Sequence, residues 1–272
     1  MKIPFDKMEG AGNDFIMIDN RSAEIPNTIK EVMVKDYCRR GMGIGADGMI
    51  FLQPDKEYDF SWDFFNSDGS KAEMCGNGAR CAARFAHKVG AAGREMTFRT
   101  LAGPIQASLT ERGAKVRLTS TILPKEPAIL NIAGQDLKIW SLNTGVPHAV
   151  IEVADLENCE VKKLGRQIRF HKHFAPAGTN VNFFKLLDDG FLAIRTYERG
   201  VEDETLACGT GTVATCIVAG MFYGKGSPIT ALTRSGEELV VYFTFADGKA
   251  DPIFLEGGAR TVFTGSFEMP TL

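Results

Sequence analysis

The chain repeats itself around two cysteines. The segment Met74-Cys-Gly-Asn-Gly-Ala-Arg-Cys returns in outline as Ala207-Cys-Gly-Thr-Gly-Thr-Val-Ala, and the two Cys-Gly-x-Gly motifs lie about half the chain length apart. Residues 59–64, before the first motif, alternate between apolar and polar as in a half-buried strand, and residues 192–197 form a second candidate strand. Because an internal repeat reflects a repeated structural unit, the sequence predicts two domains of similar construction.

A helical pattern follows each cysteine. In the first half, small apolar residues at positions 79, 82, 83, 86 and 89 lie on one face, and Gly90 is a natural C-terminal stop. In the second half, residues 212–223 are apolar nearly all round and end at Gly224, which is typical of a helix buried on every side. Each half is therefore predicted to contain a strand, a polar loop, a cysteine at a helix N-terminus and a central helix.

Short alternating segments occupy much of the remaining sequence. They include residues 115–118, 239–245 and 261–263, and Asp-Gly turn signals at Asp68 and Asp247 punctuate the pattern. Strands outnumber helices, so the predicted fold class is α+β, with two β-rich domains sharing 272 residues. The polar stretch at residues 119–124 interrupts the strand pattern and predicts a domain border near residues 120–124.

The charge balance narrows the class of partner. The 31 basic and 34 acidic residues give a net charge of -3, whereas nucleic acids and anionic membranes usually demand a basic surface. The N-terminus carries charges where a signal peptide needs an apolar run, and no stretch approaches the roughly 18 apolar residues of a membrane span. We therefore expect a cytoplasmic protein with a small-molecule substrate, no nucleic-acid partner and no membrane partner.

The six cysteines divide by context. They are Cys38, Cys75, Cys81, Cys159, Cys208 and Cys216. A disulfide framework is typical of small secreted chains, and structural zinc prefers close pairs such as C-x-x-C, which this chain lacks. Cys81 and Cys216 fall inside apolar helix faces and, like Cys38 and Cys159, are expected to be structural. Cys75 and Cys208 share the repeated glycine frame, which favours a chemical role.

A cysteine at a helix N-terminus is suited to proton transfer. The terminus carries unpaired N–H groups and about half a positive charge, which lower the pKa of a thiol and bind a carboxylate. With Cys75 and Cys208 on opposite faces of one α-carbon, one thiolate removes the α-proton and the other thiol returns a proton to the opposite face. The pattern predicts an amino-acid epimerase. No lysine context suggests a Schiff-base cofactor, so none is expected.

Longer motifs extend the argument over nearly the whole chain. They are Gly10-Ala-Gly-Asn-Asp-Phe, Gly43-Ile-Gly-Ala-Asp-Gly, the run from Asn66 to Cys81, Thr144-Gly-Val-Pro-His, Gly178-Thr-Asn-Val-Asn-Phe, Tyr197-Glu-Arg-Gly and Glu204-Thr-Leu-Ala-Cys-Gly-Thr-Gly. In these the chain closely resembles the diaminopimelate epimerase family. The resemblance implies interconversion of LL- and meso-2,6-diaminopimelate, a step toward lysine and peptidoglycan, with Cys75 and Cys208 as the acid–base pair.

The resemblance also implies a fold and a set of binding residues. Two pseudo-symmetric domains, residues 1–118 with 261–272 and residues 119–260, would each wrap strands around a central helix, with the active site in the cleft between them. The reacting carboxylate would be bound by Gly76, Asn77, Gly209 and Thr210. The ammonium at the same centre would be held by Glu198, the distal end by Asn13, Asn66, Asn180 and Arg199, and the pair would be supported by His148.

Two departures from the family pattern bear on the distal end. Many members have Asn where this chain has Val146, and Gln where it has Gly48. His171 and His173 invite a metal-binding interpretation, but their spacing near a loop favours surface residues, and no metal site is expected. Ala46 breaks the G-x-G-x-x-G spacing of a dinucleotide loop in residues 41–46.

Several alternatives stay open at this point. A racemase or epimerase for another amino acid, such as proline or histidine, would share the cysteine motifs, although Arg199 and the asparagines favour a substrate with a second amino-acid end. A thiol-redox or metal-binding protein would show a redox-active dithiol or stoichiometric metal. Two thiols facing each other could also form a disulfide when substrate is absent. A homodimer is left open.

Overall fold

The computed structural model describes residues 2–188 and 190–269. The chain divides into two compact units, with borders after Val116 and after Leu255. Unit 1 comprises the N-terminal part of the chain and its C-terminal strand, and unit 2 is Arg117–Leu255. Among the described residues, no helix combines the length and the apolar character that crossing a membrane requires.

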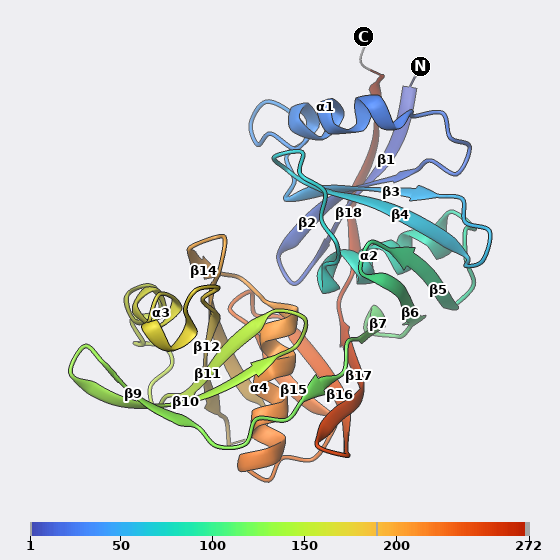
Figure 1. Cartoon of the computed structure of the whole chain (residues 1–272). Coiled ribbons are helices and arrows are strands. Elements are labelled where there is room, and N and C mark those ends of the chain that lie inside the picture. The colour runs from blue at the N-terminus through green and yellow to red at the C-terminus, as the bar shows by residue number, and fades with distance from the viewer. Residues whose placement is uncertain (1, 189, 270–272) are drawn as a thin grey trace. The chain divides into compact units, whose positions relative to one another are not determined.

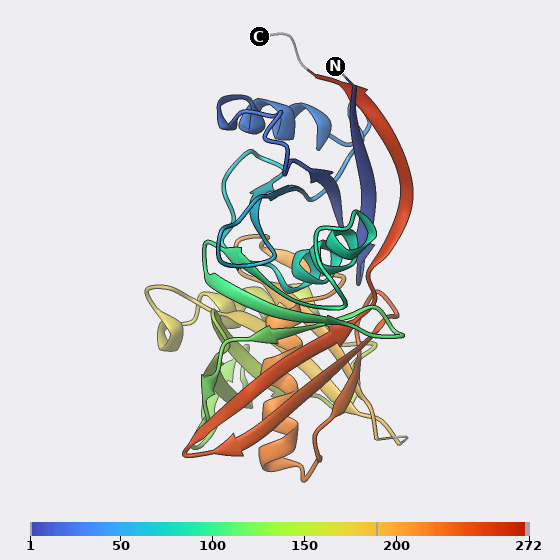
Figure 2. The same cartoon turned by 90° about the vertical axis from the view of Figure 1, so that its right-hand side faces the viewer.

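Unit 1 is a mixed sheet with two helices (Figure 1). Its strands are β1 (Lys2–Gly10), β2 (Asn13–Asp19), β3 (Gly48–Gln53), β4 (Phe60–Asn66), β5 (Glu95–Thr100), β6 (Gly103–Leu109), β7 (Ala114–Leu118, which crosses the border) and β18 (Arg260–Glu268). Its helices are α1 (Asn27–Tyr37) and α2 (Gly76–Lys88). The last strand, β18, pairs antiparallel with β1 from Lys2 to Glu9, and the two strands lie side by side in Figure 2.

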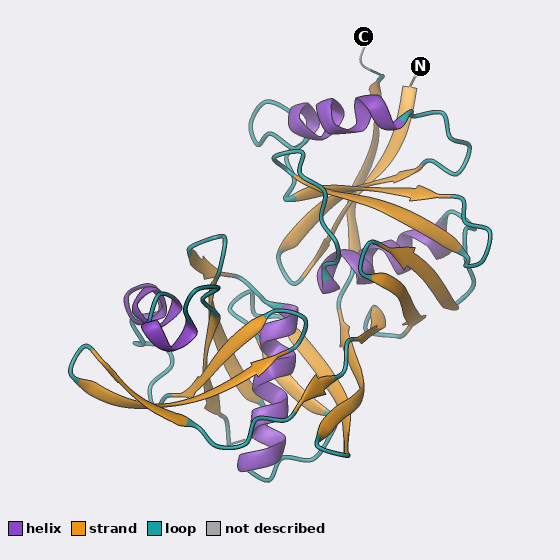
Figure 3. Ribbon diagram, in the orientation of Figure 1, coloured by secondary structure: helices purple, strands orange, loops and turns teal. Residues whose placement is uncertain are grey.

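Unit 2 has the same kind of construction. Its strands are β8 (Thr121–Ile122), β9 (Ala128–Ile132), β10 (Gln135–Asn143), β11 (Pro147–Glu152), β12 (Asn180–Leu186), β13 (Leu192–Glu198), β14 (Asp203–Thr205), β15 (Ile229–Leu232), β16 (Glu238–Ala246) and β17 (Lys249–Gly257, which crosses the second border). Its helices are α3 (Val161–Arg169), a short 3-10 turn at Lys172–Phe174, and α4 (Gly209–Phe222). Strands β10 to β13, β15 and β16 all contact α4, which lies among them in Figure 3.

The strand pairings repeat from one unit to the other. In unit 1, β2 runs parallel to β3, β3 antiparallel to β4, β4 parallel to β5, and β5 antiparallel to β6. In unit 2 the same sequence of directions joins β11, β12, β13, β15 and β16. Helices α1 and α3 occupy the first parallel connection of each unit, and α2 and α4 the second. The predicted α+β fold of two similar halves, each with a central helix, is confirmed.

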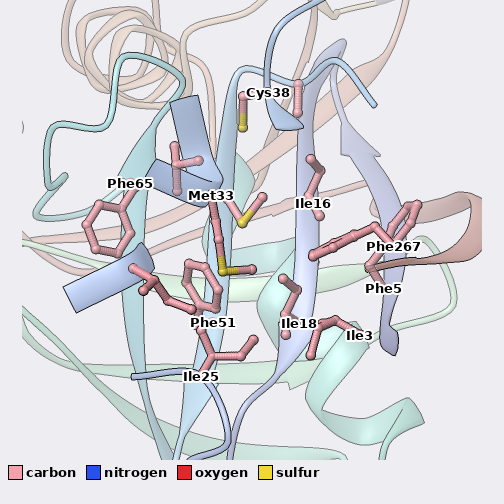
Figure 4. Close-up of a cluster of buried hydrophobic side chains, with 14 residues drawn as sticks. Ile3, Phe5, Ile16, Ile18, Ile25, Met33, Cys38, Phe51, Phe65 and Phe267 are labelled. Atoms are coloured by element: carbon pink, nitrogen blue, oxygen red, sulfur yellow. The ribbon is translucent and has the colours of Figure 1, made fainter. Parts of the chain in front are cut away.

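Apolar packing explains the two helix positions in unit 1. Helix α1 presents Met33 and Val34 to a cluster that also contains Ile16, Phe51 and Phe65 of the sheet (Figure 4). Helix α2 buries its small face, with Ala79 and Ala82 fully enclosed, against β1, β2 and β6. Small residues on this face allow the helix to approach the sheet closely, and Asn77 in its first turn lies within hydrogen-bonding distance of Asn13, the first residue of β2.

Helix α4 is enclosed for a different reason. Residues 211–219 are all buried, so the helix has no solvated face over these turns, as its all-round apolar sequence predicts. The predicted stops are also confirmed: α2 and α4 end at Lys88 and Phe222, and Gly90 and Gly224 follow with positive φ angles of 68° and 66°.

Other elements were not expected from the sequence pattern. Helices α1 and α3 have only 11 and 9 residues, and helices of this length owe most of their stability to packing on the sheet. The segment after β13 was expected to be a polar loop, but Asp203–Thr205 forms β14 and pairs back onto β13. The turn between them uses positive φ at Gly200 and Glu202.

Candidate active site

In unit 1, Cys75 caps the central helix α2. Its backbone is extended (φ -143°, ψ 124°), and its carbonyl accepts the first helical hydrogen bond from Ala79 N at 2.8 Å. The Cys75 side chain makes no capping bond, so the N–H groups at the first turn, starting with Gly76, keep the orientation that binds anions. Cys75 is half-buried.

Asn13 joins the Cys75 thiol to a charged network. Its Oδ1 accepts from Cys75 Sγ and from Asn77 Nδ2, both at 3.5 Å, and its Nδ2 donates to Asp47 Oδ2 at 2.6 Å. Asp47 in turn accepts from Arg40, which also pairs with Asp14. Burial would raise the pKa of Asp14, but the hydrogen bonds from Arg40 and from Lys7 outweigh it and lower this pKa to about 2. The ionised network holds the Asn13 amide with its oxygen toward the thiol.

Arg80, one turn further along α2, stabilises the first turn of this helix through hydrogen bonds. Its side chain is fully buried, and it donates to Asn77 Oδ1 at 2.9 Å, to the carbonyl of Gly76 at 3.4 Å and to the carbonyl of Gly258 at 3.2 Å. Asn77 is therefore oriented by two side chains, Arg80 and Asn13. Asn66 lies at the end of β4, where its amide donates to Ser70 Oγ at 3.0 Å.

In unit 2, Cys208 has the equivalent place on α4. Its backbone is extended (φ -125°, ψ 109°), and its carbonyl accepts from both N and Oγ1 of Thr212 at 2.9 Å. Cys208 Sγ lies 3.5 Å from Thr210 Oγ1, and the Thr210 carbonyl accepts from Thr144 Oγ1 at 3.0 Å. The loop before β11 is thus tied to the first turn of α4, beside Gly209.

Asn180 connects three strand ends in unit 2. Its Oδ1 accepts from the Arg199 backbone N at 2.8 Å, and its Nδ2 donates to the Pro147 carbonyl at 3.2 Å. The Arg199 guanidinium donates to the Ala177 carbonyl at 3.2 Å. Glu198, the last residue of β13, has its pKa raised by burial.

His148 is held inside unit 2 by Asn182. Asn182 Nδ2 lies 3.1 Å from His148 Nδ1 and donates to the Ala149 carbonyl at 3.0 Å. Burial, with a smaller contribution from the positive charge of Arg199, lowers the pKa of His148 to about 3. His148 is therefore neutral at physiological pH.

The arrangement suits one kind of chemistry. Each unit presents a thiol beside the first-turn N–H groups of a helix that the cysteine side chain does not cap, which is a site for a carboxylate whose α-carbon carries an exchangeable proton. Within each unit, the amide and carboxylate side chains around the thiol can bind an ammonium group or a second carboxylate.

Comparison with known proteins identifies the family. Residues 5–122 and 140–262 match the family model described as diaminopimelate epimerase. A protein named diaminopimelate epimerase from Aquifex aeolicus (strain VF5) is 48% identical, over 96% of each chain. The chain belongs to the diaminopimelate epimerase family.

A second relative and two solved structures are similar over nearly the whole chain. A protein of the same name from Archaeoglobus fulgidus is 38% identical, over 100% of this chain and 99% of the relative. Among solved structures, a PhzF-family phenazine biosynthesis protein from Bacillus anthracis superposes with a TM-score of 0.76 at 16% identity, covering 99% of this chain and 100% of the other. A probable proline racemase from Agrobacterium radiobacter K84 gives 0.69 at 16% identity, covering 98% and 93%. These likenesses show a shared fold.

The predicted site residues are divided between the two units. Unit 1 holds Asn13, Asn66, Cys75, Gly76 and Asn77, and unit 2 holds His148, Asn180, Glu198, Arg199, Cys208, Gly209 and Thr210. Hydrogen bonds link Asn13 to both Cys75 and Asn77, whereas the amide of Asn66 bonds within its own loop.

The sequence did not predict a role for Arg80 or Asn182, which make hydrogen bonds next to the first turns of α2 and α4. Arg80 stands inside the first cysteine motif, and Asn182 follows Asn180 by two positions, hence on the same strand face. Both residues could be seen in the sequence, but the groups that they contact lie far away along the chain.

The structure also places the two residues that depart from the family pattern, Gly48 and Val146. A Cβ added to Gly48 would lie 2.6 Å from the Phe65 carbonyl. Val146 is half-buried, and its carbonyl accepts a hydrogen bond from Thr144 N.

Proposed function

We propose that this protein epimerises LL-2,6-diaminopimelate to the meso form by two-base proton transfer between Cys75 and Cys208. The observation that carries the proposal is the repeated half-site: a thiol at the N-terminus of the central helix in each of two units with the same topology. The names of the full-length relatives support the substrate. The reaction would supply the precursor of lysine and of peptidoglycan.

The proposed step needs no redox change. The α-carbon–hydrogen bond breaks and its proton goes to one sulfur, while the electron pair is delocalised into the carboxylate. The proton of the other thiol then forms the new bond on the opposite face and leaves a thiolate behind. Helix N–H groups stabilise the charge that grows on the carboxylate, and exclusion of water strengthens them.

The binding roles are proposed from the two half-sites. The helix turns that begin at Gly76 and Gly209, with Asn77 and Thr210, would bind the reacting carboxylate. Glu198 would hold the ammonium at the same centre. The distal amino-acid end would be read by Asn13, Asn66, Asn180 and Arg199, while His148 would support the cysteine pair.

Solvent exchange tests the proposal. In D₂O, wild-type protein should place one deuterium at the inverted centre of LL-diaminopimelate, detected by mass spectrometry and by loss of the α-proton NMR signal. Cys75→Ser and Cys208→Ser should each lower epimerisation by about 10²-fold or more, because each removes one acid–base group. Cys159→Ser, which alters a half-buried cysteine just before α3 and outside both Cys-Gly-x-Gly motifs, is the matched control.

Two results would contradict it. Inversion at near wild-type rate in either helix-terminal variant would remove that sulfur from the mechanism. Inversion of free proline or histidine in preference to LL-diaminopimelate would replace the substrate.

A further inference from the structure

Three strand positions lie in register beneath the first turn of each central helix. In unit 1, Phe15 pairs with Gly48 across β2 and β3, and Ile50 pairs with Phe64 across β3 and β4. In unit 2, the matching pairs are His148 with Asn180 and Asn182 with Thr196. The equivalent residues are thus Phe15, Ile50 and Phe64 in unit 1 and His148, Asn182 and Thr196 in unit 2.

The unit 1 trio is apolar and packs on the helix through a glycine. A Cβ added to Gly78 would lie 3.1 Å from Ile50 Cδ1 and 3.5 Å from the Phe15 ring. The rings of Phe15 and Phe64 meet edge to face, with centroids 5.8 Å apart. The fold therefore accepts a fully apolar trio at these three positions.

The unit 2 trio is polar at every position and just as deeply buried. Asn182 is fully buried, His148 is 1% exposed and Thr196 3%. Asn182 Oδ1 accepts from Thr196 Oγ1 at 3.0 Å, and a Cβ added to Gly211 would lie only 2.1 Å from that same oxygen. Since buried polar groups cost free energy that the apolar trio does not, their presence points to a task other than packing.

The hydrogen bonds determine which nitrogen of His148 carries the hydrogen. The Ala149 carbonyl accepts only, so the group of Asn182 facing it is the NH₂. The second hydrogen of this NH₂ points to His148 Nδ1, which must then be the acceptor. A neutral imidazole with an accepting Nδ1 carries its hydrogen on Nε2.

The hydrogen bonds that run from Thr196 through Asn182 to His148 end at Nε2 of the histidine. Among the described residues, this buried atom has no hydrogen-bond partner. An unsatisfied buried donor costs free energy, so the N–H is poised to donate to a group that arrives with a ligand. A neutral donor of this kind stabilises negative charge and takes no proton itself.

We propose that Asn182, oriented by Thr196, is a positioning residue that locks His148 as a neutral Nε2–H donor beside the Cys208 helix turn. The inference rests on the proposed function, in which that donor stabilises negative charge on a thiolate or on the substrate. It leaves proton abstraction to the cysteines, because a histidine with hydrogen on Nε2 and an occupied Nδ1 has no nitrogen available as a base.

Imidazole ¹⁵N NMR reads the tautomer directly. The chain has four histidines, so the signals of His148 are those absent from the His148→Gln spectrum. In ligand-free wild-type protein at neutral pH, we expect a pyrrole-type nitrogen at Nε2 and a pyridine-type nitrogen at Nδ1. In Asn182→Asp, the carboxylate accepts where the amide donated, so Nδ1 should gain hydrogen.

Kinetics on the same variants separate positioning from folding. Asn182→Asp should lower kcat about 10- to 100-fold, in the range typical of outer partners of a functional histidine, with a smaller effect on KM. Thr196→Val should shift the tautomer balance of His148 toward hydrogen on Nδ1, as Asn182→Asp does. Thr196→Ser keeps the donating hydroxyl and should therefore retain the wild-type spectrum and kcat. Circular dichroism and urea unfolding check that each variant folds.

Three results would overturn the inference. The wild-type protein could carry the hydrogen on Nδ1 of His148, its ring could be charged at neutral pH, or folded Asn182→Asp could give an unchanged spectrum. If Asn182→Asp does not fold, the wild-type spectrum and the two Thr196 variants decide it. Because the spectrum needs no substrate, its outcome is distinguishable from failure of the proposed function. An inactive protein with the Nε2–H tautomer would contradict only the proposed epimerase function. An active protein with the Nδ1–H tautomer would contradict only this inference.

Discussion

At position 148 a histidine is almost completely enclosed, and the enclosure makes the stability of the fold depend on pH. Its pKa falls from 6.5 to about 3, chiefly through burial. Between these values the unfolded chain binds more protons than the folded protein. The free energy of unfolding therefore rises with pH across this window, and stability is lost as the pH falls from 6.5 toward 3.

Replacing this histidine should flatten that dependence. We expect His148→Gln to reduce the slope of unfolding free energy against pH, between about 3 and 6.5, by up to roughly 1.4 kcal/mol per pH unit. Urea unfolding at a series of pH values measures the slope, with His87→Gln, an exposed histidine, as control. Equal slopes in wild type and His148→Gln would mean that the ring is charged in the folded state.

The six thiols should differ sharply in reactivity. Cys81 and Cys216 are fully buried, and burial raises the pKa of Cys38 to about 12 and that of Cys216 further. Cys75 is half-buried at a helix N-terminus, which favours the reactive thiolate. Brief treatment of folded protein with iodoacetamide should therefore modify Cys75 well before these three buried thiols, as peptide mass spectrometry would report. Equal labelling of Cys75 and Cys216 would contradict the burial argument.

At the scale of elements, each central helix meets its sheet through one glycine in the first turn. Gly78 packs on the flexible end of Ile50, whereas Gly211 packs on the Asn182 amide, which three hydrogen bonds hold in place. The same contact is therefore soft in α2 and rigid in α4, because a methyl group can turn aside and a hydrogen-bonded amide cannot.

Alanine substitutions should report this difference. Gly211→Ala should lower the free energy of unfolding by about 1–3 kcal/mol, as overpacking in a core does, and Gly78→Ala by clearly less. Gly226→Ala, where nothing lies within 4 Å of the new Cβ, should stay within about 0.5 kcal/mol. Urea unfolding of the three variants gives the ranking, and a Gly78→Ala as damaging as Gly211→Ala would refute it.

At the scale of the whole molecule, the proposed mechanism requires both sulfurs to reach one carbon. A reagent with two thiol-reactive arms no longer than the substrate should therefore link Cys75 to Cys208, in competition with diaminopimelate. Cys75→Ser and Cys208→Ser are the controls, and mass spectrometry of the digested protein identifies the linked peptides. Linking only with reagents much longer than the substrate would count against a shared carbon.

The sequence by itself determined the features that depend on neighbours along the chain. The two cysteine–glycine frames, the strand before each and the helix stops at Gly90 and Gly224 are local, because capping, turn chemistry and apolar periodicity act within a few residues. The duplication followed from comparing these local patterns, and it was enough to predict the two-part α+β fold.

Only the tertiary structure decided which side chains stand beneath the two helix turns. Arg80 meets the Gly258 carbonyl, and Asn182 meets His148, across separations of 178 and 34 residues. Such contacts depend on strand register and on which strands become neighbours, for which a single sequence carries no local signal. The register also revealed that one trio of positions is apolar in unit 1 and hydrogen-bonded in unit 2. That contrast can be seen only once the strands are paired, because it compares residues that have equivalent positions in the two units but no similarity in sequence.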